Sequence, residues 1–110
     1  LLFCEAVLRL KQAHPEVVLE AAIPCQSQAD RWNPRQQERY RRLLAQCDLE
    51  TLIQKDYTPD CMQRRNCYMV DRSSLLIALY DGSPGGGTCS TLLYAIRRAL
   101  EVIQLDPAGF

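Results

Sequence analysis

The 110-residue sequence has few of the residues that common catalytic and metal sites need. It contains one histidine, one tryptophan and two lysines, and its six cysteines form no CxxC pair. With His14 as the only histidine, neither a structural zinc site nor a Ser-His or Cys-His catalytic pair is expected. No apolar run approaches the ~18 residues of a membrane-spanning helix. The sequence therefore predicts neither a zinc protein nor a protein with a membrane span.

The sequence also has no excess of charge of either sign. Thirteen basic and thirteen acidic residues balance, 24% of the residues are charged and 47% are hydrophobic, as in ordinary folded proteins. One globular domain over residues 1–110 is expected. Without a basic excess, nucleic acid is not expected as a partner, although eleven of the thirteen cations are arginines, which suit forked contacts with phosphate or carboxylate.

The cysteines lie among apolar neighbours and lack the spacing of redox pairs. We interpret them as small core residues and predict that all six are reduced. Free thiols are typical of reducing compartments, so a cytoplasmic location is expected.

Helical and strand-like patterns alternate along the chain. Two helix starts carry a capping residue directly before a proline, at Asn33-Pro34 and at Thr58-Pro59. The apolar runs VVLEAAI and LLIALY are typical of buried parallel strands. Four helices are expected: at residues 1–14, from 33–34 onward with apolar positions 40, 43, 44 and 47, at 60–73, and from 88 onward. Four strands are expected, at 17–23, 48–54, 75–80 and 102–105.

This order predicts an α/β fold with a doubly wound, mostly parallel sheet and helices on both faces. Such a fold normally begins with a strand, whereas this chain begins within a helix. We therefore expect that an N-terminal strand-helix-strand portion lies outside the sequence and that the chain is a C-terminal fragment of a longer domain. The unpaired apolar edge that results would be covered either by that segment or by other copies in a homo-oligomer.

The strongest candidate site is the glycine run after the strand at 75–80. Ligands of open α/β sheets gather at the carboxyl ends of the strands. There Gly85, Gly86 and Gly87 precede Thr88 at a helix start, where glycine lets an anion approach the backbone and helical amides point toward it. A phosphate is the ligand expected, and a flexible surface turn is the alternative. The run matches neither the P-loop nor the GxGxxG pattern.

Two further segments are candidates for the same site. On the helix at 60–73, Arg65 and Asn66 are expected to reach a ligand above the sheet, and Asp71 is expected to pair with a nearby arginine. In the loop before residue 33, Arg31 could hold a phosphate and Trp32 could stack on a base. The alternative for Trp32 is packing as a hydrophobic staple onto the following helix.

Four stretches, AIPCQSQADRWN, QERYRRLLAQCD, YTPDCMQRRNCYMVDRSSLLIALYDG and PGGGTCSTLLYA, strongly resemble the YpsA-like family (DUF1273) of the SLOG superfamily of Rossmann-like proteins. Relatives in this superfamily include the DNA-processing protein DprA and LOG-type phosphoribohydrolases. The resemblance implies a Rossmann-like fold and a small-molecule nucleotide ligand such as a nucleoside phosphate, NAD or an ADP-ribose derivative. The family's usual GHR-like segment and GxxxGxD motif are absent from this sequence, which agrees with the expectation of a fragment.

The resemblance also separates binding from catalysis. LOG-type hydrolases carry a glutamate in the pattern PGGxGTxxE, whereas here Thr88 is followed by Cys89, Ser90 and Thr91. A regulatory binding or sensing module is therefore expected rather than an enzyme. Two alternatives stay open: a nucleotide hydrolase that uses residues of the absent N-terminal segment, and a protein-interaction scaffold.

Overall fold

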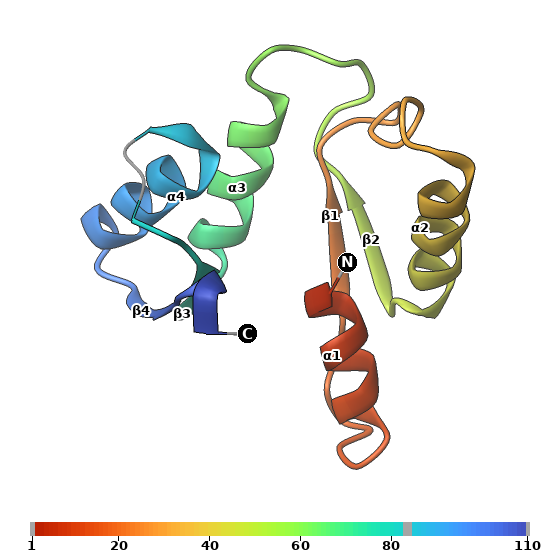
Figure 1. The fold of residues 1–110 in the computed structure, drawn as a ribbon, viewed down its shortest axis with the longest axis horizontal. Coiled ribbons are helices and arrows are strands. Elements are labelled where there is room, and N and C mark those ends of the chain that lie inside the picture. Colours follow the sequence, from red (N-terminus) through yellow and green to blue (C-terminus); the bar gives the residue numbers. More distant parts are fainter. Residues whose placement is uncertain (1, 83–84, 110) are drawn as a thin grey trace. The chain divides into compact units, whose positions relative to one another are not determined.

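The computed structural model describes residues 2–82 and 85–109, so Leu1 and the Ser83-Pro84 part of the glycine loop lie outside the described residues. Within these ranges helices and parallel strands alternate as the sequence predicts, which confirms the α/β, Rossmann-like fold class (Figure 1). The elements are α1 (Leu2–Lys11), β1 (Glu20–Ile23), α2 (Pro34–Gln46), β2 (Leu49–Leu52), α3 (Cys61–Asp71), β3 (Leu75–Leu79), α4 (Gly86–Arg97), β4 (Glu101–Leu105) and a 3-10 turn (Pro107–Gly109).

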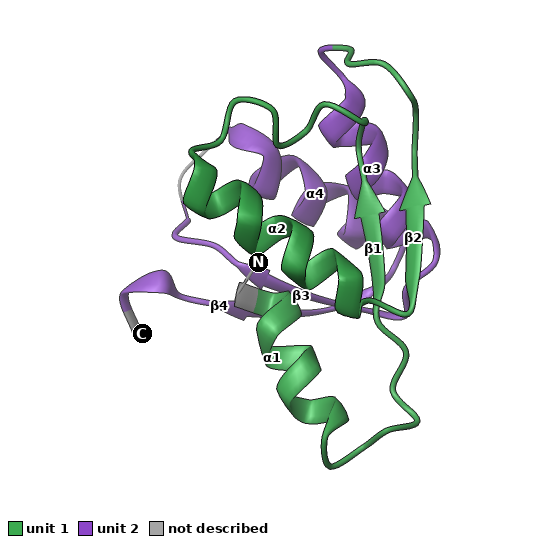
Figure 2. Ribbon diagram, turned by 90° about the vertical axis from the view of Figure 1, so that its right-hand side faces the viewer, with its two compact units in different colours: residues 1–58 green, residues 59–110 purple. Residues whose placement is uncertain are grey.

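The chain divides into two compact units, residues 1–58 and 59–110 (Figure 2). Within its described residues, each unit contains two α-helices and one pair of parallel strands. The sequence predicts a single sheet, whereas the four strands hydrogen-bond as two separate pairs, β1 with β2 and β3 with β4. The apolar pattern of a strand indicates that it is paired and partly covered, but it does not identify the neighbouring strand.

In the first unit, β1 and β2 run in parallel from the pair Glu20 and Leu49 to the pair Ile23 and Leu52. Helices α1 and α2 pack against each other, and the carboxylate of Glu5 forms an ion pair with the guanidinium of Arg39. The carboxylate of Asp48 accepts hydrogen bonds from the backbone N–H of Leu19 and from the ammonium of Lys11. These two donors lower the pKa of Asp48 and stabilise its charged form.

The first strand is shorter than the sequence predicts. Strand β1 begins at Glu20, so the strand predicted from Val17 starts three residues too early; Val18 is 65% exposed, whereas Leu19 is buried. The physical reason is pairing: the ladder begins where Glu20 lies opposite Leu49, the first residue of β2. The carbonyl oxygen of Leu19 still accepts a hydrogen bond from the backbone N–H of Leu49, but Val17 and Val18 precede the ladder.

Helix α2 begins where the sequence predicts. The side-chain oxygen Oδ1 of Asn33 accepts a hydrogen bond from the backbone N–H of Gln36 at 2.9 Å, and Pro34 is the first helical residue. This cap satisfies one of the N–H groups that a helix start leaves without an intrahelical acceptor. Leu43 is buried on the apolar side of the helix. The predicted helix start is therefore confirmed.

In the second unit, α4 packs against both β3 and β4, and α3 packs against α4 (Figure 1). The side chains of Cys61 and Val70 in α3 and of Leu92 and Ala95 in α4 form its buried core. Helix α3 begins one residue after the predicted start at Asp60 and ends two residues before the predicted end at 73. The carboxylate of Asp60 does not cap the helix but accepts from Nε of Arg64 at 2.9 Å.

All six cysteine thiols are free. Cys25 and Cys61 are buried, and the other four are partly covered. Across residues 2–82 and 85–109, no helix combines the length and the apolar character that are needed to cross a bilayer.

Candidate functional site

The backbone at the start of α4 has a conformation that only glycine adopts readily. Gly85 occupies the N-cap position with φ 80° and ψ −178°, and Gly86 follows with φ 83°. The first of these combinations is essentially restricted to glycine, because any Cβ would clash with its own backbone. Two of the three glycines are therefore explained by the turn from strand into helix.

Gly87 has no such explanation. Its φ is not positive, and a Cβ built on it would meet no atom within 4 Å. Neither backbone conformation nor packing requires glycine there, although glycine in a helix costs about 0.5–1 kcal/mol relative to alanine. The missing side chain leaves the backbone at the start of α4 open to close approach from outside.

A cavity of about 430 Å³ lies beside this helix start. It is lined by Met62, Arg65 and Asn66 of α3, residues 76–79 of β3, and Gly87, Thr88 and Thr91 of α4. An adjoining cavity of about 250 Å³ is lined by residues 79–81, residues 85–88 and Pro107. Gly87 and Thr88 border both, so the helix start forms the shared wall of the two cavities.

Among the described residues that line the larger cavity, Arg65 is the only charged one. Its Nε donates to Oδ1 of Asn66 at 2.8 Å, and its Nη2 lies 3.7 Å from Sδ of Met62. Burial lowers the pKa of Arg65, and among the described residues no carboxylate forms an ion pair with it. A half-buried cation without an anion is unfavourable, so a negative group in this cavity would be stabilised.

The neighbouring arginine provides a contrast. Arg64 is more exposed, and its Nε pairs with Oδ2 of Asp60 at 2.9 Å one helical turn earlier. Two consecutive arginines of α3 thus have different surroundings: one is neutralised at the surface, and the other faces the cavity without a counter-charge.

Of the candidate residues from the sequence, Arg65, Asn66, Gly87 and Thr88 line the larger cavity, and Gly85 and Gly86 line the adjoining one. Sequence reasoning missed Met62 and Thr91. Both could have been found from helical spacing, because Met62 lies three residues before Arg65 and Thr91 lies four residues after Gly87. The hydroxyl of Thr91 donates to the carbonyl oxygen of Gly87 at 2.8 Å.

The remaining candidates are Asp71 in the second unit and Arg31 and Trp32 in the first unit. Asp71, at the C-terminal end of α3, accepts a hydrogen bond from the hydroxyl of Tyr94 at 2.7 Å. Its carboxylate also lies 3.4 Å from Nε of Arg98, and the sequence predicts that Asp71 pairs with a nearby arginine. In the first unit, Arg31 is exposed. Trp32 packs edge-on against Tyr40 of α2, with ring centroids 5.2 Å apart, as in the packing alternative.

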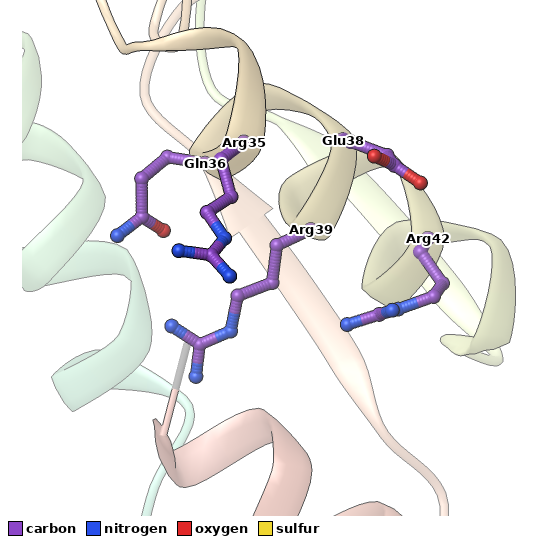
Figure 3. A pocket seen from close by; sticks show the side chains of 5 residues that line it. All are labelled: Arg35, Gln36, Glu38, Arg39 and Arg42. Atoms are coloured by element: carbon purple, nitrogen blue, oxygen red, sulfur yellow. The ribbon is translucent and has the colours of Figure 1, made fainter.

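A separate hollow of about 500 Å³ lies in the first unit, along α2. It is lined by Arg35, Gln36, Glu38, Arg39 and Arg42 (Figure 3). The sequence analysis gave these residues no role. Among the residues that the structure describes, no group of three His, Cys, Asp or Glu side chains could hold a metal ion.

Comparisons with known proteins agree on one family. The model of the YspA SLOG family matches residues 1–102. The chain is 33% identical to the uncharacterized SPbeta prophage-derived protein YoqJ of Bacillus subtilis (strain 168), in a match that covers 94% of this chain and 68% of YoqJ. It is 33% identical to a UPF0398 protein of Bacillus pumilus and 31% identical to the UPF0398 protein YpsA of B. subtilis, each match covering 73% of this chain. These two matches span only 46% and 48% of the relatives, so the chain corresponds to about half of each.

Proposed function

Because the chain belongs to the YspA SLOG family, we propose that it binds a nucleotide-related ligand in the cavity beside the start of α4. Membership of this family suggests a nucleotide-related role. The ligand class is a nucleoside phosphate, NAD or an ADP-ribose derivative, all of which carry phosphate. The chain then acts as a binding or sensing module.

The observation that carries the proposal is Arg65, a half-buried guanidinium without a carboxylate partner among the described residues. A phosphate in the cavity would neutralise this cation and accept its forked hydrogen bonds. Thr88 offers a hydroxyl in the first turn of α4, and the positive end of the helix dipole adds to the attraction. Three independent features therefore favour an anion at the same place.

The other walls of the cavity suit the rest of a nucleotide. Met62 and the β3 residues Leu76 to Leu79 supply apolar surface, and Asn66 supplies a polar side chain to the lining. Small-molecule sites combine apolar walls with a few polar groups that fix the ligand's orientation. We assign Arg65 and Thr88 to binding of the phosphate. Gly87 lets the phosphate approach the backbone closely, and Asn66 recognises the rest of the nucleotide.

Binding is favoured over hydrolysis by the residues that follow the glycine run. Cys89, Ser90 and Thr91 stand where the similar LOG-type hydrolases carry their glutamate, so the first turns of α4 offer no carboxylate to act as a general base. Incubating the full-length protein with AMP, NAD or ADP-ribose should then leave each compound intact. Release of free base or phosphate would support the hydrolase alternative instead.

The direct test compares two neighbouring arginines of α3 in the full-length protein. Mass spectrometry of the denatured protein first identifies any nucleotide that co-purifies, and calorimetric titration with AMP, NAD and ADP-ribose measures affinity. Arg65→Gln should weaken binding roughly tenfold or more, since a hydrogen bond to a charged group contributes about 1.5–3 kcal/mol. Arg64→Gln is the matched control, because it removes the same charge outside the cavity. Equal affinities of the two variants would contradict the proposal.

A further inference from the structure

Three arginines form one face of α2. Arg35, Arg39 and Arg42 follow one another at intervals of four and three residues, so they lie on the same side of the helix, at rises of about 6 Å and about 4.5 Å. Figure 3 shows their guanidinium groups extending on one side of α2. We call these three residues the arginine face. They border the hollow of about 500 Å³, a volume within the range of small-ligand sites.

The arginine face has more positive charge than its surroundings neutralise. Arg39 is paired with Glu5 of α1. Arg35 and Arg42 are exposed and have no carboxylate partner among the described residues. Glu38 also borders the hollow, but Figure 3 shows its carboxylate turned away from the three guanidinium groups. The hollow is therefore positively charged, in a chain whose formal net charge is zero.

The chemistry of this face favours phosphate. All three cations are arginines, and the planar guanidinium group makes forked hydrogen bonds to phosphate oxygens. The row extends over about 10 Å along the helix axis, from the rise of about 1.5 Å per residue. A chain of linked phosphates can lie along this row and offer each guanidinium group its own oxygens, which a single phosphate does not.

A strand of nucleic acid fits the face less well. Binding of single strands relies on aromatic side chains on which bases stack. None of the described residues that border the hollow is aromatic, and Trp32 and Tyr40 of the same unit pack ring against ring. The face thus offers forked contacts to phosphate but no aromatic surface on which bases stack.

We propose that the arginine face of α2 binds a linear oligophosphate of three or more phosphates. This site lies in the first unit, and its residues are separate from those of the nucleotide site proposed above. Gln36 adds an amide donor at the edge of the hollow, and the Glu5 carboxylate holds Arg39 in place without neutralising Arg35 or Arg42.

The test titrates the full-length protein with sodium tripolyphosphate and, at matched ionic strength, with orthophosphate. Tripolyphosphate should bind roughly tenfold or more tightly than orthophosphate, because several charge-assisted contacts form at once. The double variant Arg35→Gln/Arg42→Gln should lose that preference. The double variant Arg9→Gln/Arg41→Gln is the control: both arginines are exposed residues of the same unit, and neither borders the hollow.

Three outcomes would overturn the proposal: equal affinity for orthophosphate and tripolyphosphate, equal losses in the two double variants, or tighter binding of a single-stranded oligonucleotide than of tripolyphosphate. Arg65→Gln distinguishes this site from the nucleotide site. It should leave the preference for tripolyphosphate over orthophosphate unchanged, whereas loss of that preference in this variant would place the oligophosphate at α4 and refute the assignment to α2.

Discussion

Alanine substitutions at Gly85 and Gly87 are expected to change stability in opposite directions, although the two residues are only two positions apart. At Gly85 the backbone has φ 80° and ψ −178°, where a residue with a side chain carries strain of about 1–3 kcal/mol. A Cβ at this position meets no atom within 4 Å, so no packing clash adds to the strain. Restriction of the unfolded chain by alanine offsets about 0.4–1 kcal/mol. The net expectation for Gly85→Ala is a loss of roughly 1–2 kcal/mol.

Gly87 lies within α4, without a positive φ and with open space around its Cβ position. Gly87→Ala should therefore stabilise the folded protein by about 0.4–1 kcal/mol. Urea unfolding of the full-length protein, followed by circular dichroism, measures both changes as shifts of the midpoint at constant slope. A Gly85→Ala midpoint at or above that of the unsubstituted protein would refute the reasoning, and so would a drop for Gly87→Ala.

The same Gly87→Ala variant tests the nucleotide site without the complication of a damaged fold. Its methyl group projects into the open space where the ligand is proposed to approach the backbone, so nucleotide affinity should fall while stability rises. Opposite changes in the two measurements are not explained by partial unfolding. Unchanged affinity in this variant would show that the ligand does not approach the backbone at Gly87.

Three further predictions concern other parts of the chain. Ala99 has φ 60°, so Ala99→Gly should relieve strain of about 1–2 kcal/mol, offset by about 0.4–1 kcal/mol for the freer unfolded chain; stability should rise by roughly 0.5–1 kcal/mol, and a lower urea midpoint would contradict this. The folded-state pKa of Asp48 lies below its ordinary value of 3.8, chiefly because the backbone N–H of Leu19 donates a hydrogen bond to its carboxylate. The charged carboxylate therefore stabilises the fold above pH 3.8, and this stabilisation is lost as the pH falls through the folded-state pKa. Asp48→Asn should lower the urea midpoint at neutral pH and weaken its fall in acid, and an unaltered pH profile would contradict this. Burial and the adjacent Cys4 thiol raise the pKa of Cys47 to about 11. Iodoacetamide should therefore label Cys47 slowly at neutral pH and faster as the pH approaches 11. Labelling at neutral pH as fast as that of an exposed thiol would contradict this.

Local signals predicted the elements well. The Asn33-Pro34 pair marked the start of α2, because an N-cap hydrogen bond spans only three residues and needs no distant partner. The apolar run from Leu75 marked β3 for a related reason, since β-strand character is visible in consecutive residues. Alternation of such segments was enough to predict an α/β fold with parallel strands.

Features that depend on distant residues were predicted less well. The strand expected from Val17 begins only at Glu20, where its partner strand begins. The glycine run was identified from its position after a strand, but the sequence does not distinguish Gly85, whose conformation requires glycine, from Gly87, whose conformation does not. Adjacent glycines can have different backbone angles, because these angles are set by how the loop enters the helix.

The sequence by itself determined the order of the elements, their approximate limits and the segment that begins α4, because these follow from neighbours within one or two helical turns. The tertiary structure alone decided which side chains share a cavity and which charges are neutralised. Arg64 and Arg65 look equivalent in the sequence, yet packing leaves one paired with Asp60 and the other facing the cavity. The physical reason is that burial and Coulomb interactions depend on distance in space. Residues of α3, β3 and α4 line one cavity although they are far apart in the sequence, and no local pattern encodes that.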